Sequence, residues 1–242
     1  MKVLYRNIVL LAIVAAAYSC KKDNYDPPKS QLSGRLVYQG QPINLQYNSV
    51  TYQLYQYGFG QVGPIGNSFA PDGSYSQVLY DGDYKLIIPN GQGPFMWKYT
   101  STGAPDSLSV TMKGNQTLDI EVTPYYLITS PQITAAGTDS VSATFGIQKI
   151  ITDSINAKDI EFVALYVNKT QFVSGSSSEN INDFEATPAA IAGSAITDMS
   201  NIQLGARYKA PATTQNYMFA RIGLKIVNVE DLIFSPVIKI DL

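Results

Sequence analysis

The chain has 242 residues, enough for two ordinary domains, and its 17 basic and 19 acidic residues give a net charge of −2. It has no histidine and a single cysteine, which excludes Ser-His-Asp and Cys-His catalysis, nearly all zinc sites and a disulfide framework. We expect no cofactor, and no nucleic acid as partner, because no basic cluster stands in the body of the chain. Abundant glycine (18), proline (13) and tyrosine (17) indicate short strands joined by turns.

Residues 1–19 have the pattern of a secretory signal. Two basic residues precede an unbroken apolar run over residues 8–17, which is too short to span a membrane because a span takes about 20 apolar residues. The small residues Ala17 and Ser19 precede Cys20. This arrangement resembles a bacterial lipobox, in which the cysteine thiol is alkylated by diacylglycerol and becomes the new N-terminus. The alternative is a plain signal peptide followed by an unmodified cysteine.

A lipidated Cys20 would attach the protein to a membrane. Buried acyl chains contribute about 0.8 kcal/mol per CH₂, and more than one chain gives a stable anchor. Residues 20–29 are polar and contain two prolines, so we expect a tether without secondary structure. Its lysines, followed by an acidic residue, resemble the surface-export signal of Bacteroidota lipoproteins. We therefore expect an outer-membrane location facing the cell exterior, with the periplasmic face as the alternative.

The first folded unit is predicted over residues 30–123. Residues 107–112 and 117–122 alternate apolar and polar side chains on either side of a turn, which predicts a hairpin with one buried face. The stretch "PDGSYSQVLYDGDYKLII" places two glycine turns between strands. Within it, Tyr84 is expected to form a tyrosine corner, whose hydroxyl donates to the main chain. The spacing resembles carboxypeptidase-regulatory-like (transthyretin-related) β-sandwich modules.

The second unit is predicted over residues 124–242. Residues 141–147, 218–226 and 238–242 alternate in polarity, and a continuous apolar run over residues 162–167 indicates a central strand. The stretch "NYMFARIGLKIVNVEDLIFSPVIKIDL" resembles the last two strands of a fibronectin type III or immunoglobulin-like domain, with Pro236 suited to an edge strand. The expected fold class is all-β, with two β-sandwich domains: carboxypeptidase-regulatory-like, then immunoglobulin-like.

Several of these features occur in one order along the chain. They are the lipobox, the tether "KKDNYDPP", the first strand "SGRLVY", the glycine turns and "LDIEVTPYYLI" at the domain boundary. This order resembles a family of uncharacterised Bacteroidota outer-membrane lipoproteins. The resemblance implies genes beside SusC-like transporters and SusD-like glycan-binding proteins, and it supplies no catalytic residues.

Two aromatic stretches are candidates for ligand binding. Sugars are bound by flat aromatic faces together with a few polar groups. The stretches "TYQLYQYGFG" and "NGQGPFMWKYT" supply the candidates Tyr55, Tyr57, Phe59, Phe95, Trp97 and Tyr99. Trp97 and Tyr99 rank first, because the glycine-proline loop before them is expected at the surface. The alternative for each residue is packing in a core or between the domains.

Two further patterns concern modification and metal binding. An Asp-Ser-apolar pattern that matches Bacteroidota O-glycosylation occurs at Ser107, Ser140 and Ser154. The alternative is chance, because a pattern of only three residues is loose. The Asp-Gly pairs at 72–73 and 81–82 lack the spacing of a calcium loop. They fit turns, so we expect no metal site.

The expected function is that of a non-catalytic, lipid-anchored accessory of a Sus-type glycan-uptake complex. It would bind an oligosaccharide or a SusC-like or SusD-like protein. The first alternative is a structural or adhesive surface lipoprotein that uses exposed edge strands. A glycosidase is disfavoured, because the acidic residues stand mostly singly in turns or at strand ends and show no acid/base pair.

Overall fold

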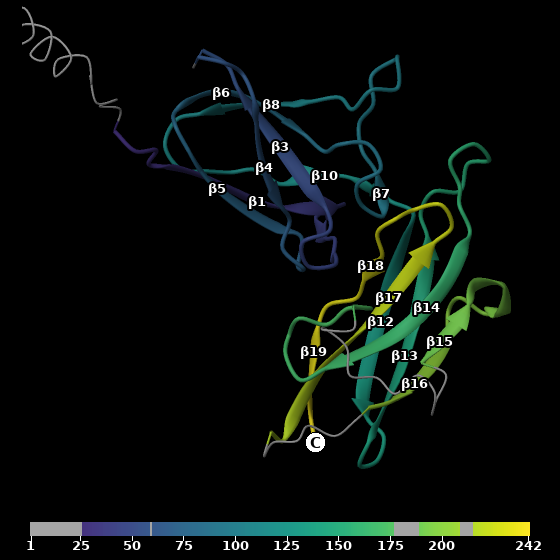
Figure 1. Ribbon diagram of the computed structural model, residues 1–242. Helices are drawn as coiled ribbons and strands as arrows, with labels where there is room; N and C mark the ends of the chain where they lie inside the picture. Colours follow the sequence, from purple (N-terminus) through teal and green to yellow (C-terminus); the bar gives the residue numbers. More distant parts are fainter. Residues whose placement is uncertain (1–25, 59, 177–188, 209–214) are drawn as a thin grey trace, which may run out of the picture.

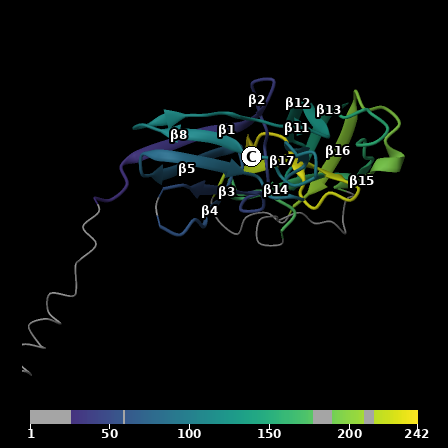
Figure 2. The ribbon, with the colours of Figure 1, turned by 90° about the horizontal axis from the view of Figure 1, so that it is seen from above.

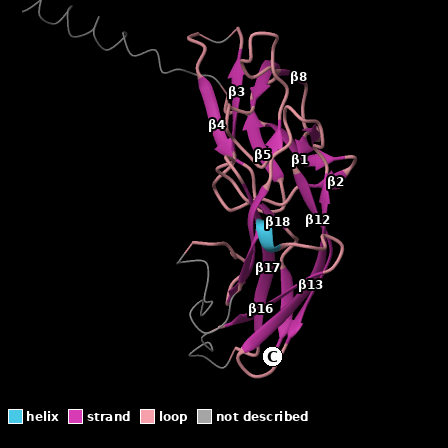
Figure 3. Ribbon diagram, turned by 90° about the vertical axis from the view of Figure 1, so that its right-hand side faces the viewer, coloured by secondary structure: helices cyan, strands magenta, loops and turns pink. Residues whose placement is uncertain are grey.

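The computed structural model describes residues 26–58, 60–176, 189–208 and 215–242, which form two all-β domains lying end to end (Figure 1). The predicted two-sandwich fold class is confirmed. Within these ranges the helical structure is one 3-10 turn, Gly193–Ala195 (Figure 3), and no helix there has the length and apolar character to cross a bilayer. Cys20 and the predicted signal lie outside the described residues.

The first domain is built from two sheets that enclose one core. One sheet surrounds a central strand, β1, and its members are β1 (Ser30–Tyr38), β2 (Gln41–Pro42), β5 (Ser74–Leu79), β9 (Gln116–Thr117) and β10 (Ile120–Glu121). The other has the order β4-β3-β6-β8, with β3 (Thr51–Gln56), β4 (Pro64–Ser68), β6 (Gly82–Ile87) and β8 (Leu108–Met112). A short pair, β7 (Phe95–Met96) and β11 (Thr123–Pro124), leads toward the second domain.

The predicted hairpin over residues 107–122 is wrong in its pairing. Strand β8 pairs with β6, whereas β9 and β10 run parallel to β1 in the opposite sheet. The chain therefore crosses the sandwich between these strands. Both segments alternate in polarity because each covers the same core from its own side, and alternation does not reveal the partner strand.

The tyrosine corner is confirmed. The ring of Tyr84 is buried, and its hydroxyl donates a hydrogen bond to the carbonyl oxygen of Tyr80 at 2.8 Å. Burial raises the pKa of the Tyr84 hydroxyl, and the bond with Tyr80 opposes that shift. The bond ties the turn at Gly82 to the strand that follows, as the spacing of the sequence predicts.

The second domain is also a sandwich. Its smaller sheet has the order β12-β13-β16, with β12 (Tyr126–Ala135), β13 (Ser140–Lys149) and β16 (Ile202–Arg207). The larger sheet contains β14 (Ile160–Asn168), β15 (Ala190–Ala192), β17 (Tyr217–Ile226), β18 (Ile233–Phe234) and β19 (Ile238–Asp241). The strands predicted from periodicity are thus present, and Pro236 lies in the break between β18 and β19.

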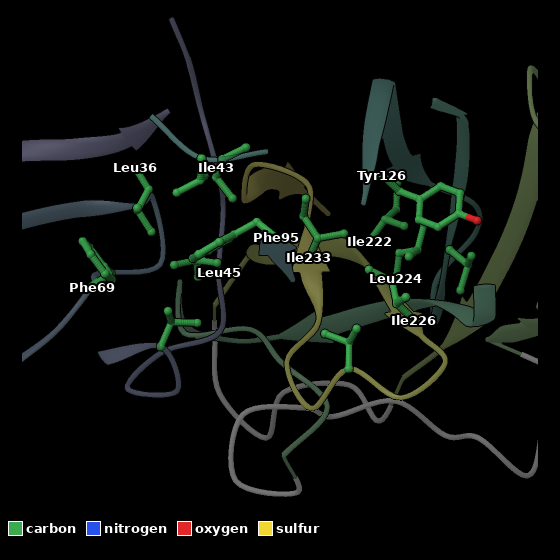
Figure 4. Packing of buried hydrophobic residues seen from close by; sticks show 14 of the residues in the cluster. Leu36, Ile43, Leu45, Phe69, Phe95, Tyr126, Ile222, Leu224, Ile226 and Ile233 are labelled. Carbon is green, nitrogen blue, oxygen red and sulfur yellow. The ribbon is translucent and has the colours of Figure 1, made fainter. Parts of the chain in front are cut away.

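The cores of the two domains join at their boundary. The chain passes from one domain to the other at β11 and β12 (Figure 2). One continuous cluster of buried apolar side chains contains members of both domains (Figure 4), including Leu36, Ile43, Leu45, Phe95, Ile222, Leu224 and Ile233. Burial of apolar surface at the junction stabilises one relative placement of the domains.

Polar contacts fix this placement further. The Phe234 N–H donates to the carbonyl oxygen of Asn44 at 3.1 Å, and the Gly93 N–H donates to the buried carboxylate of Asp231 at 2.7 Å. The guanidinium of Arg221, which is 1% exposed, donates to the Leu45 carbonyl oxygen at 2.9 Å. Each contact joins the two domains, so the interface is specific as well as apolar.

Candidate functional site

Two of the predicted ligand-binding residues are core residues. Phe95 is 4% exposed and Trp97 is 6% exposed, and the Trp97 indole N–H donates to the carbonyl oxygen of Asp106 at 3.1 Å. The expected surface position of Trp97 is therefore wrong. Phe95 begins β7 directly after the glycine-proline loop and Trp97 follows the strand, and both side chains belong to the buried core cluster that the two domains share, in agreement with the alternative of core packing.

The other aromatic candidates lie at separate places. Tyr55 is half-buried and its hydroxyl donates to the Gln53 side chain at 2.8 Å, while Tyr57 is exposed beyond the end of β3. Tyr99 is 46% exposed and lines a pocket of about 380 Å³ together with Tyr125, at the domain junction. Phe59 lies outside the described residues. Of the described candidates, Phe95 and Tyr99 thus line one pocket, whereas Tyr55 and Tyr57 lie at β3, away from it.

A wider groove, here called the first groove, has a volume of about 870 Å³ and lies beside β1 and β5. Its rim carries two exposed aromatic side chains, Tyr47 at 52% and Phe172 at 43% exposure. Their ring centroids are 5.3 Å apart at an interplanar angle of 64°. Tyr47 comes from the first domain and Phe172 from the second, so the two rings meet only because the domains pack against each other.

Tyr47 is held by the turn that contains it. Asn48 has a positive φ of 56°, which an asparagine tolerates better than most residues. Its side-chain oxygen accepts a hydrogen bond from the Ser68 hydroxyl at 2.9 Å, and the Ser49 hydroxyl donates to the Gln46 carbonyl oxygen at 3.3 Å. These bonds order the turn and leave the Tyr47 ring on the rim.

Many of the other residues that line the first groove are polar, and the one lysine or arginine among them, Arg35, is balanced by Asp119. Its walls present short hydroxyl, amide and carboxylate groups, on Ser33, Asn48, Asn67, Ser68, Ser74, Ser76, Thr117 and Asp119. The Arg35 guanidinium lies 3.6 Å from the Asp72 carboxylate beside this lining. Such groups can donate to and accept from sugar hydroxyls, while the two aromatic rings supply apolar faces.

The electrostatics of Asp72 do not suit a general acid. Partial burial acts to raise its pKa, but the hydrogen bonds from Ser74 and the charge of Arg35 outweigh burial and hold that pKa below its usual value. A glycosidase acid needs the opposite shift. Across the described ranges no three histidine, cysteine, aspartate or glutamate side chains gather into a metal-binding group.

The three serines of the Asp-Ser-apolar pattern differ in accessibility. Ser107 and Ser140 are half-buried, and the Ser140 hydroxyl donates to the Ala136 carbonyl oxygen. Ser154 is exposed in a turn, where the Asp153 carboxylate accepts the Asn156 N–H at 2.9 Å. O-glycosylation stays a prediction, and Ser154 is the most accessible of the three positions.

Tyr47 and Phe172 are not among the binding residues that the sequence predicts. Each stands without another aromatic residue within four positions, in "NLQYNSV" and "NKTQFVS", so no local cluster marked either residue. A large aromatic side chain in a polar turn was the available signal. Their proximity depends on the packing of one domain against the other, which no local pattern encodes.

Comparisons with known proteins identify the two domains. The model described as protein of unknown function (DUF3823), N-terminal domain, matches residues 30–123, and the model described as domain of unknown function (DUF3823_C) matches residues 126–239. No curated protein matched the chain.

Three solved structures, the first two of DUF3823 family proteins, resemble most of this chain. One from Parabacteroides merdae ATCC 43184 has 30% identity and a TM-score of 0.72, and one from Bacteroides ovatus ATCC 8483 has 26% identity and a TM-score of 0.69. A third, from Bacteroides uniformis ATCC 8492, has 18% identity, a TM-score of 0.65 and a suggested role in carbohydrate binding. Each match covers 89% of this chain and 100% of the other. The chain belongs to the DUF3823 family.

Proposed function

We propose that this protein is a non-catalytic saccharide-binding lipoprotein and that the first groove is its binding surface. The observation that carries the proposal is the pair of exposed rings, Tyr47 and Phe172, on the rim of a groove lined with short polar side chains. Sugar rings have apolar C–H faces and polar edges, so they match aromatic platforms surrounded by hydrogen-bonding groups.

The proposal places this surface at the outer membrane, held by lipid on Cys20, as an accessory of a Sus-type glycan-uptake complex. The signal-like N-terminus and the polar tether motivate the anchor. The Bacteroides uniformis relative with a suggested role in carbohydrate binding supports the choice of ligand class. The lowered pKa of Asp72 and the close Arg35 favour binding over hydrolysis.

The groove predicts a specific loss of binding. In titration calorimetry against a panel of oligosaccharides, we expect Tyr47→Ala to weaken binding about tenfold, because a ring contact contributes about 0.5–1.5 kcal/mol beyond its buried area. Phe172→Ala should act similarly. Tyr57→Ala removes a tyrosine of comparable exposure outside the groove and should leave affinity unchanged. If the native protein bound no saccharide and co-purified with a SusD-like protein, the partner of the groove would be that protein and not a sugar.

The anchor predicts a defined N-terminus. Mass spectrometry of the protein purified from membranes is expected to show a chain that begins at Cys20 and carries acyl groups on that residue. Cys20→Ser should release the protein into the soluble fraction, whereas Ser19→Ala, which keeps a small residue before the cysteine, should not. An unmodified thiol in the native protein would contradict the anchor and leave the groove unaffected.

A further inference from the structure

A second groove adjoins the first. It has a volume of about 500 Å³, and it shares the lining residues Pro71 and Phe172 with the first groove. Its other walls come from both domains: Asn44, Asp72, Gln171, Phe219, Pro236, Val237 and Lys239. Pro71 and Phe172 therefore border both grooves, and the two adjoining grooves are together called the path.

Aromatic side chains line both grooves of this path. Tyr47 and Phe172 flank the first groove, and Phe219 of β17 lines the second. Phe219 contacts Tyr217, two residues before it on the same strand face, with ring centroids 5.7 Å apart. A single sugar residue can contact only one or two of these aromatic rings. An extended chain can place successive apolar faces against successive rings.

The charges beside the path favour a neutral ligand. Among the described side chains that line the two grooves, the cations are Arg35 and Lys239. Each already has a carboxylate nearby, Asp72 at 3.6 Å from Arg35 and Asp241 at 3.4 Å from Lys239. Asp119 adds a further negative charge. A chain with uronate or sulfate groups would meet more negative than positive charge, because neither cation is unopposed.

The path is also fixed in shape before a ligand arrives. Asn44 lines the second groove, and its carbonyl oxygen accepts the Phe234 N–H across the domain boundary at 3.1 Å. The next residue, Leu45, accepts the buried guanidinium of Arg221 at 2.9 Å. These contacts fix the position of one groove relative to the other, so binding would cost little free energy for ordering the domains.

We propose that the ligand is an extended, uncharged oligosaccharide that lies along both grooves and contacts both domains. This inference rests on the proposed saccharide binding and adds the length and the charge class of the ligand. Tyr47 and Phe172 would bind one part of the chain, and Phe219 would bind the next.

The test measures affinity against chain length. Gluco-, manno- and xylo-oligosaccharides of increasing length, and galacturonate oligomers as acidic probes, are titrated into the full chain by calorimetry. For the neutral series that binds, affinity is expected to rise about tenfold or more between the short and the long members, because each additional ring contact adds binding free energy. Acidic oligomers of equal length should bind more weakly.

Variants assign the gain to the second groove. Phe219→Ala should remove most of the gain with length while the short members bind as before, whereas Tyr47→Ala should weaken short and long members alike. Phe219→Leu removes the ring but keeps an apolar side chain of similar volume, so it should fold normally. An effect on binding equal to that of Phe219→Ala would then come from the loss of the ring and not from a folding defect. Affinity independent of length, tighter acidic binding, or a Phe219 variant without effect would overturn the inference and leave saccharide binding intact. Failure of every series to bind would overturn both proposals.

Discussion

Arg221→Ala is expected to lower the free energy of unfolding by about 3 kcal/mol and to separate the unfolding of the two domains. The Arg221 side chain donates to the carbonyl oxygens of Leu45 and Val173, and its guanidinium lies 3.7 Å from the centroid of the Phe234 ring. Truncation leaves both buried oxygens without these donors, at about 1–3 kcal/mol for each unsatisfied group. It also removes a desolvated cation–π contact of about 2 kcal/mol.

An opposing effect limits the loss. Burying a cation costs several kcal/mol of solvation free energy, and this cost disappears with the side chain. The orphaned oxygens and the space left by the largest fully buried side chain of the described residues outweigh that relief. The net change is therefore about 3 kcal/mol rather than the sum of the lost contacts. Leu45 belongs to the first domain, so the same change loosens the junction.

The measurement uses two signals in a urea titration. Trp97 is the single tryptophan and is buried at the edge of the first domain beside the junction, so its fluorescence reports the unfolding of that domain and the opening of the junction, while circular dichroism reports the strands of both domains. We expect the two transitions to coincide in the native protein and to separate in Arg221→Ala. Arg207→Ala, at a half-exposed ion pair with Asp139, is the control and should cost less than about 1 kcal/mol. Coincident transitions with an equally small loss for Arg221→Ala would contradict the prediction.

Local patterns in the sequence predict much of this fold. Alternating polarity located β13, β17 and β19, and the continuous apolar run located β14, because side-chain burial follows the period of a strand. The turn at Gly82 followed by Tyr84 predicted a bond to the main chain that the structure contains. These features depend on residues close together in the chain, which is why the sequence alone reveals them.

Features that depend on distant residues were not predictable in this way. The partner of β8 was misassigned, because β6 and the following strand offer equally suitable apolar faces. Trp97 was placed at the surface because its loop is rich in glycine, yet it is buried in the core cluster that both domains share. Arg221 gave no sign of burial, and the pairing of Tyr47 with Phe172 arises only after the domains pack.

Gly34→Ala is expected to destabilise the first domain by more than about 3 kcal/mol. A Cβ atom at this position would lie 1.9 Å from the carbonyl oxygen of Leu118 and 3.0 Å from the Tyr75 ring. The obstacle is backbone, so a side-chain rotation does not relieve it, and the segment between β9 and β10 must move away from β1. Overpacking usually costs about 1–3 kcal/mol of stability. Because the obstacle here is main chain, we expect this substitution to cost at least the upper value of that range.

The displacement also breaks a set of hydrogen bonds. Leu118 donates its N–H to the Ser33 carbonyl oxygen at 2.8 Å and accepts the Tyr75 hydroxyl at 2.7 Å, and the Asp119 carboxylate accepts the Arg35 N–H at 2.9 Å. Each bond contributes about 1 kcal/mol. They hold the floor of the first groove, so saccharide affinity should fall together with stability.

Gly66→Ala supplies the matched control. Gly66 lies in the edge strand β4, where the nearest atom to an added Cβ is the Tyr52 carbonyl oxygen at 3.8 Å, an ordinary contact. Alanine there should be neutral or stabilising by up to about 1 kcal/mol, because glycine weakens a strand. Urea unfolding followed by Trp97 fluorescence compares the two variants. Equal stability of Gly34→Ala and Gly66→Ala would mean that the β9–β10 crossing does not lie against β1, and the floor of the groove would need a different account.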